Sequence, residues 1–93
     1  MNEKILERKL TAKVKSMGGL SLKFTSPGFD GVPDRIILLP GGRIAFAELK
    51  APGKHPRPLQ DVRIGQLRAL GFPVYVIDRE EQIGGVLDEI SPS

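Results

Sequence analysis

Two apolar segments joined by Pro40-Gly41-Gly42 constrain this chain more than any other feature. The first, residues 35 to 39, reads RIILL, and the second, residues 43 to 51, reads RIAFAELKA. Apolar segments on either side of a glycine-containing turn predict a β-hairpin. The first segment is apolar without interruption after its arginine, as expected of a strand that is buried on both faces. The hairpin therefore predicts a sheet at the centre of the domain.

The residues before the hairpin predict one helix and one further strand. In residues 2 to 17 apolar side chains recur at helical spacing, and Gly18-Gly19 ends the segment. In residues 20 to 25 apolar and polar side chains alternate, which predicts an edge strand with one buried face. The apolar positions are Leu6, Leu10, Val14 and Met17 in the helix and Leu20, Leu22 and Phe24 in the strand.

The residues after the hairpin predict a loop, a helix, a strand and a last helix. Pro52-Gly53 stops the hairpin, and a basic, proline-rich loop leads to a helix over residues 59 to 70. The segment 72 to 77 reads FPVYVI, a short strand, and residues 78 to 90 predict a short helix that is broken or bent at Gly84-Gly85. The apolar positions of the helix over residues 59 to 70 are Leu59, Val62, Leu67 and Leu70.

The order α-β-β-β-α-β-α predicts an α/β fold with a small mixed sheet flanked by helices. The helical crossover into the last strand is expected to make that strand parallel to a neighbour. The chain, residues 1 to 93, is expected to be one domain. Its length is close to the size at which a single core gives marginal stability, so a subunit partner would stabilise it.

Composition narrows the class of protein. The chain has no cysteine, so neither disulfides nor thiolate metal sites are expected, and the default location is intracellular. No apolar run reaches the ~18 residues that cross a bilayer, and the first residues, MNEKILERKL, do not form a signal peptide. Lys and Arg number 14 against 11 Asp and Glu, a formal charge of +3 that favours a polyanionic partner.

Glu48 and Lys50 interrupt the second arm of the hairpin. Both are expected on the strand face that also carries Ile44 and Phe46, at the end of an apolar stripe. A Glu-x-Lys triplet alone is weak evidence, because Glu7-Arg8-Lys9 is another in this chain. The simplest alternative is an edge strand with a solvated ion pair. Ionisable groups among apolar ones are costly without partners, which favours a functional site.

The length of the hairpin loop decides what lies opposite Glu48. If the loop is the three residues 40 to 42, Leu39 pairs with Arg43 and Asp34 lies opposite Glu48. A loop of Gly41-Gly42 alone would turn Asp34 away. A functional acid pair therefore requires the odd-length loop or a bulge.

Two opposed carboxylates repel one another unless a proton or a cation lies between them. Oxygen ligands suit Mg²⁺ or Mn²⁺, which keep several waters and accept substrate phosphate oxygens as further ligands. Such a cation polarises a phosphodiester and activates water. Lys50, on the same face, would orient that water or neutralise charge on the phosphate. The pattern of Asp34, Glu48 and Lys50 thus predicts hydrolysis of a phosphodiester.

Three motifs together resemble the virus-type replication-repair nuclease (VRR-NUC) domain of the PD-(D/E)XK superfamily. They are the stretch 31 to 34 (GVPD), the stretch 48 to 50 (ELK) and the stretch 58 to 60 (PLQ). The resemblance extends from the first helix to the strand FPVYVI. It implies a restriction-endonuclease-like core, divalent-metal dependence and nuclease activity.

The resemblance also implies further site residues. A glutamate on the first helix would join Asp34 and Glu48 at the metal; Glu7 is the first choice and Glu3 the competing one. Gln60 would bond the attacking water or a phosphate, and the backbone carbonyl of Leu49 would be another metal ligand. Stand-alone members of the family resemble Holliday-junction resolvases, which implies a homodimer acting on branched DNA, with a phage or bacterial origin.

Basic and polar residues near the acid-bearing strand ends are expected to contact DNA phosphates. The five aromatic residues offer no stacking platform for single strands, which favours recognition of duplex backbone or junction shape. The alternatives are a less selective flap or duplex nuclease and a DNA-binding module without catalysis. The expected DNA contacts are Lys23, Ser26, Arg35, Lys54, His55 and Arg57.

Overall fold

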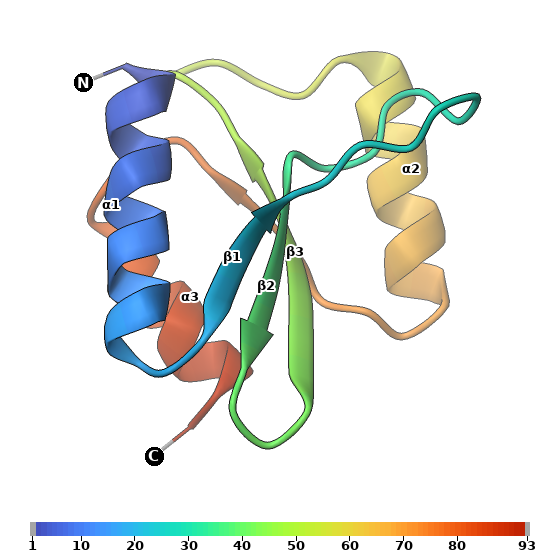
Figure 1. Cartoon of the computed structure of the whole chain (residues 1–93). Coiled ribbons are helices and arrows are strands. Elements are labelled where there is room, and N and C mark those ends of the chain that lie inside the picture. The colour runs from blue at the N-terminus through green and yellow to red at the C-terminus, as the bar shows by residue number, and fades with distance from the viewer. Residues whose placement is uncertain (1, 93) are drawn as a thin grey trace.

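A four-stranded mixed sheet with helices on both faces makes up the computed structural model, which describes residues 2–92 (Figure 1). The strands lie in the order β1-β2-β3-β4; the first three are antiparallel and β4 is parallel to β3. The predicted α/β class, element order and parallel last strand are confirmed. In chain order the elements are α1 (Glu3–Ser16), β1 (Leu20–Lys23), β2 (Arg35–Leu39), β3 (Arg43–Leu49), α2 (Pro58–Ala69), β4 (Val74–Ile77) and α3 (Gln82–Ile90).

The main core lies between the sheet and helices α1 and α3, which cover the same face (Figure 1). Three of the four predicted apolar positions of α1 are confirmed, since Leu6, Leu10 and Val14 are buried; the fourth, Met17, follows the helix as its C-cap and is partly buried against the same core. Strand alternation sends Ile37 and Ala45 to this face, where they meet the helices. Buried residues from α1, β2, β3, β4 and α3 all join this cluster.

The opposite face carries α2 and a much smaller core. Phe46, Ile64 and Val74 are its buried members, and several neighbouring side chains are only partly covered. Helix α2 packs against β4, at one edge of the sheet, so β1 at the other edge receives no helix on this face from residues 2–92 (Figure 1). The two faces of the sheet are therefore closed to different degrees.

This asymmetry corrects the predicted burial of β1 and β2. Leu20 and Leu22 were expected to be buried, and they are 59% and 43% exposed because no helix of residues 2–92 covers the face on which they lie. In β2, Ile37 and Leu39 are buried, but Ile36 and Leu38 on the α2 face are only half-buried. The strand is thus fully buried on one face alone.

The inward face of α2 also differs from the prediction. Leu59, Val62 and Leu70 were expected to face the sheet, but all three are exposed. The buried residues of this helix are Gln60 and Ile64, one turn apart. The helix is rotated so that a polar side chain, Gln60, faces the sheet; its partner is described below.

Helix α3 is continuous through Gly84 and Gly85, so the predicted break is wrong. The helix starts at Gln82, later than expected, because residues 78 to 81 form a turn. The Gln82 side-chain oxygen accepts hydrogen bonds from the backbone N–H groups of Asp78 (2.8 Å) and Arg79 (2.9 Å), which stabilises that turn. Strand β4 is likewise shorter than predicted, since it starts at Val74. None of the helices within residues 2–92 combines the length and the apolar character that crossing a membrane requires.

Candidate active site

The register of the β2–β3 hairpin places Asp34 and Glu48 at the same level of the sheet. Leu39 pairs with Arg43 and Arg35 with Ala47, so the next position on each strand brings Asp34 opposite Glu48. The loop is the three residues 40 to 42, as the acid pair requires. Gly41 and Gly42 adopt φ values of +89° and +73°, a region that glycine enters without strain. The predicted register is confirmed.

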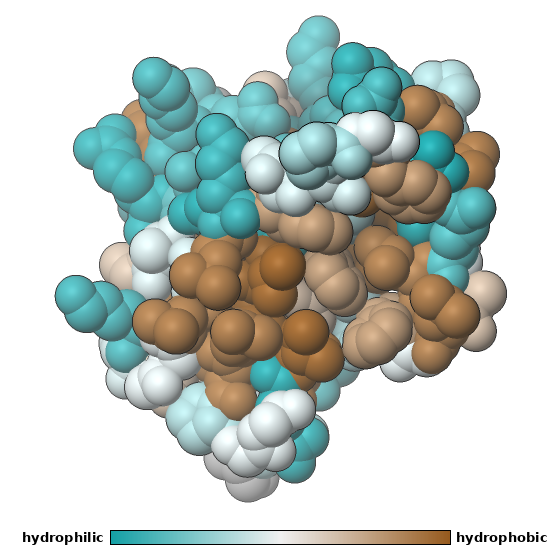
Figure 2. Space-filling model, turned by 45° about the vertical axis from the view of Figure 1, so that its right-hand side comes forward, coloured by the Kyte–Doolittle hydropathy of each residue, from teal (hydrophilic) through white to brown (hydrophobic). Residues whose placement is uncertain are grey.

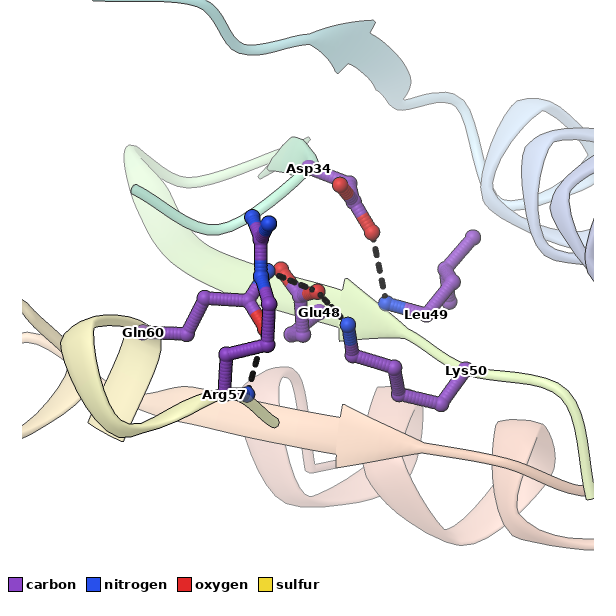
Figure 3. A network of polar contacts seen from close by, with 6 residues as sticks. All are labelled: Asp34, Glu48, Leu49, Lys50, Arg57 and Gln60. Atoms are coloured by element: carbon purple, nitrogen blue, oxygen red, sulfur yellow. Dashed lines mark hydrogen bonds and ion pairs between the residues drawn. The ribbon is translucent and has the colours of Figure 1, made fainter. Parts of the chain in front are cut away.

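Glu48 is the most unusual side chain of the molecule, because it is a carboxylate that is only 1% exposed. Its Oε2 accepts a hydrogen bond from Gln60 Nε2 (2.8 Å) and lies 3.0 Å from Lys50 Nζ (Figure 3). Its Oε1 is buried and has no hydrogen-bond partner among the described residues. Burial raises the pKa of Glu48 above its usual value, and the nearby charge of Asp34 adds to this, while Lys50 opposes it.

Asp34 ends the loop that precedes β2 and is held by the neighbouring strand. Its Oδ2 accepts a hydrogen bond from the backbone N–H of Leu49 at 2.9 Å (Figure 3). This bond fixes one carboxylate oxygen. The other, Oδ1, accepts no hydrogen bond from residues 2–92. Asp34 lines two hollows, one on the α1 side of the sheet and one on the α2 side. A ligand can therefore reach it from either side.

Gln60 is buried and hydrogen-bonded at both ends of its amide. Its Nε2 donates to Glu48, and its Oε1 accepts from the backbone N–H of Arg57 at 2.8 Å (Figure 3). The second bond ties the side chain to the start of α2. Gln60 thus orients the Glu48 carboxylate, whereas the sequence suggested contact with water or phosphate.

Glu7 lies near the acid pair but is held by an arginine. Its Oε1 is 3.5 Å from the guanidinium of Arg35, which also donates to Thr11 Oγ1 at 3.0 Å. Both Glu7 and Glu3 line the α1-side hollow together with Asp34 and Leu49. Within residues 2–92 no three acidic or histidine side chains are gathered closely enough to hold a metal ion by themselves.

The residues expected to contact DNA are distributed unevenly around the acids. Lys23 lines the α1-side hollow, and Ser26 and Arg57 line the α2-side hollow. Lys54 and His55 are exposed in the loop that follows β3. Arg35 differs from the others, because it is buried against α1.

The position of Arg35 could have been read from the sequence. Successive residues of a strand point to opposite faces, so Arg35 must face α1 if Asp34 belongs to the acid pair. Its hydrogen bond to Thr11 was not predicted, because no sequence motif indicates it. It depends on how α1 packs on the sheet.

The side chains of Asp34 and Glu48 are suitable ligands for a hard divalent cation. Both are carboxylates, and Glu48 Oε1 is buried without a hydrogen-bond donor, an arrangement that a cation would satisfy. Two protein carboxylates are few, but Mg²⁺ and Mn²⁺ commonly complete their shells with water and substrate oxygens.

An acid pair and a lysine lie where β2 begins and β3 ends, and a glutamine of α2 is hydrogen-bonded to one of the acids. This set of residues fits a nuclease-type site. Two comparisons agree with that class. The chain is 44% identical over 81 residues to "Putative nuclease p44" of Acyrthosiphon pisum secondary endosymbiont phage 1, covering 87% of each chain. A solved structure described as a VRR-NUC domain superposes with a TM-score of 0.87 at 28% identity, covering 92% of this chain and 94% of that one.

No protein-family model matches the sequence. The level of identity and the coverage nevertheless establish the relationship, and this chain belongs to the VRR-NUC family of nucleases.

Proposed function

We propose that this protein is a Mg²⁺- or Mn²⁺-dependent, structure-specific DNA endonuclease that acts as a homodimer on Holliday junctions. The observation that carries the proposal is the buried Glu48 carboxylate beside Asp34 and Lys50; one oxygen of this carboxylate has no hydrogen-bond donor in the described part of the chain. A buried charge of this kind costs stability, and hydrolysis of DNA explains its presence.

Asp34 and Glu48 would hold the cation, with Glu7 and the Leu49 carbonyl as further candidate ligands. When bound, the cation would supply charge neutralisation for the phosphodiester and an activated water. Glu7 would have to leave Arg35 to take part, since the two are 3.5 Å apart. Glu3 lines the same hollow and remains the alternative.

Lys50 and Gln60 support the reaction in different ways. The Lys50 ammonium lies 3.0 Å from Glu48 and can place positive charge on the reacting phosphate or hold the water. Gln60 donates to Glu48 and keeps its carboxylate in one orientation. Of the residues proposed for catalysis, Gln60 is therefore a positioning residue.

Basic side chains around the acids would guide the DNA backbone to the site. Lys23 and Arg57 line the two hollows that reach Asp34, and Lys54 and His55 are exposed on the adjoining loop. Ser26, on the α2 side, can donate to a phosphate oxygen. Arg35 would not contact DNA; its role would be to hold Glu7 through their ion pair.

A Holliday junction presents two symmetric strands, which suits a two-fold dimer of a chain too small to cover a branched substrate alone. A relative encoded by a phage supports an intracellular enzyme of phage or bacterial DNA metabolism. A less selective flap or duplex nuclease is the alternative. A non-catalytic DNA-binding module is disfavoured, because the Asp34 and Glu48 carboxylates would repel DNA and would have no role in binding it.

The test is a cleavage assay on four-way, flap, nicked and linear DNA with Mg²⁺, Mn²⁺ or EDTA. Glu48→Ala should reduce cleavage by at least about 100-fold while DNA binding is kept, and Lys50→Ala should slow turnover more than it weakens binding. Asp88→Ala, which removes an exposed acid on α3, is the matched control. Full cleavage by the Glu48→Ala protein would exclude the proposed mechanism, and equal cleavage of all four DNAs would favour the less selective nuclease.

A further inference from the structure

The α2 face of the sheet leaves a broad apolar surface open beside the acid pair. Leu20, Leu22 and Phe24 lie on this face along β1 and its continuation, and Leu70 and Phe72 lie at the end of α2. Phe29, in the loop before β2, lines a groove with Phe24 and Leu70. We call these six residues the open apolar face. Figure 2 shows it as a brown area that runs from the sheet to the helix.

Large side chains of the open apolar face are exposed to an extent that is uncommon in a monomer. The exposed fractions are 74% for Leu70, 59% for Leu20, 45% for Phe29, 43% for Leu22 and 38% for Phe72. Taking roughly 200 Å² as the full surface of a large side chain, these five expose on the order of 500 Å². A patch of this size on a small domain indicates a binding surface.

The core beneath this surface is only half closed. On the α1 and α3 face most apolar side chains of the sheet are buried and Tyr75 is partly buried, but on the α2 face Ile36, Ile44 and Phe24 are partly covered neighbours of only three buried residues. The phenylalanines continue this incomplete core to the surface, since the ring centroids of Phe24 and Phe46 are 5.6 Å apart and those of Phe46 and Phe72 are 5.9 Å apart. Such a core resembles a domain interior cut in half, as is typical of subunit interfaces.

The chemistry of this surface does not suit the DNA backbone. Its groove, about 490 Å³ in volume, has Arg63 as its charged lining residue. That guanidinium lies 3.7 Å from the centre of the Phe29 ring and donates to the Asp30 carbonyl (2.8 Å) and to Gln66 (3.1 Å). A phosphate would therefore meet mostly leucine and phenylalanine and a cation that is already engaged.

We propose that a second copy of this chain covers the open apolar face, in a two-fold dimer in which the same surface is used by both protomers. A stable interface takes roughly 800 Å² from each partner, and about 65% of a homodimer interface is apolar. The estimated apolar area, on the order of 500 Å², agrees with both figures. A rim of polar residues would supply the remainder.

The proposed interface adjoins the nuclease site. Phe24, Ser26 and Phe29 line both the apolar groove and the hollow that contains Asp34 and Gln60. A partner on the open apolar face would therefore contact the loop that leads into Asp34. This inference rests on the dimer of the proposed function and assigns the surface that forms it.

Sedimentation equilibrium of the full chain from about 1 to 100 µM tests the inference. The wild type should be a dimer, and Leu20→Glu and Leu70→Glu should each raise the dimer Kd by at least about 30-fold, the effect of a hot-spot residue. Val62→Glu is the matched control, because Val62 is 52% exposed and points outward from α2, opposite the buried Gln60 and Ile64. Circular dichroism melts identify any variant that fails to fold.

A wild type that stays monomeric at about 100 µM would overturn the inference, and so would a folded pair of leucine variants that dimerise as tightly as the wild type. Dissociation by Val62→Glu to the same extent would also overturn it, because the surface would then not be specific. Cleavage of nicked or linear DNA is measured on the same samples. Cleavage by a monomer would leave the nuclease assignment standing, whereas a dimer without cleavage would support the interface and reject the nuclease.

Discussion

At the scale of single residues, the candidate site replaces favourable burial with an unfavourable charge. A valine or isoleucine at position 48 would continue the apolar row that Ile44 and Phe46 form on the same face of β3. The structure has there a carboxylate that is 1% exposed, and one of its oxygens has no hydrogen-bond donor within residues 2–92. Lys50 and Gln60 both contact the other oxygen, so they compensate only part of the cost. Glu48 therefore makes the protein less stable than an apolar residue at this position would, as expected of a functional site.

The raised pKa of Glu48 makes stability depend on pH. An acid whose pKa is higher in the folded than in the unfolded state contributes stability below its unfolded value, 4.5, and loses that contribution as the pH rises through the folded value. The free energy of unfolding of the metal-free protein should therefore decrease as the pH rises from 4.5 to the pKa of folded Glu48. Glu48→Gln should remove that loss and be more stable at neutral pH by roughly 1 kcal/mol. Thermal melts in EDTA from about pH 4 to 8 measure both effects.

Asp88→Asn serves as the control for this change, since Asp88 is exposed on α3 and should keep the pH dependence of the wild type. The same decline with pH in the Glu48→Gln protein would show that other groups cause it. The buried charge would then not be the source of the effect.

At the scale of elements, the sequence predicts the hairpin well and the packing of α2 poorly. The strand period and the three-residue loop suffice to place Asp34 opposite Glu48, because both are local properties. The face that α2 turns to the sheet is not local. The predicted apolar positions Leu59, Val62, Leu67 and Leu70 share one side of the helix, yet the helix is turned so that Leu59, Val62 and Leu70 are exposed. The buried position goes to Gln60, because Glu48 offers it a hydrogen bond. A buried polar pair cannot be read from hydrophobic spacing.

The exposed glycines of α3 lower the stability of that helix. Gly84 and Gly85 lie inside a continuous helix, and a Cβ added at either position would meet nothing within 4 Å. Gly84→Ala and Gly85→Ala should therefore each stabilise the protein by about 0.5 to 1 kcal/mol, because alanine loses less backbone entropy on folding. Urea unfolding measures the change. Gly71→Ala is the control and should destabilise, since Gly71 has a φ of +96°; a destabilising alanine in α3 would contradict the continuous helix.

At the scale of the whole molecule, the candidate site lies between helices that pack on opposite faces of the sheet. Asp34 precedes β2, Glu48 belongs to β3, and Gln60 attaches Glu48 to α2 on one side. On the other side the hollow reaches Glu3 and Glu7 on α1. A cation bound between these elements would stabilise the folded state as a whole, because the unfolded chain does not gather its ligands.

Metal binding should therefore raise the melting temperature independently of cleavage. At about 100 times its Kd, Mn²⁺ should add about 2.7 kcal/mol, or a rise of roughly 10 to 20 °C for a domain of this size. Glu48→Ala should abolish the rise. Glu7→Gln and Glu3→Gln separate the two candidate ligands on α1: the true ligand should weaken Mn²⁺ binding by about 10-fold or more, and the other should leave it unchanged. Isothermal titration of Mn²⁺ into the metal-free variants gives the Kd values directly. An unaltered rise in the Glu48→Ala protein would place the cation elsewhere, because the only buried carboxylate of residues 2–92 would then take no part in binding it.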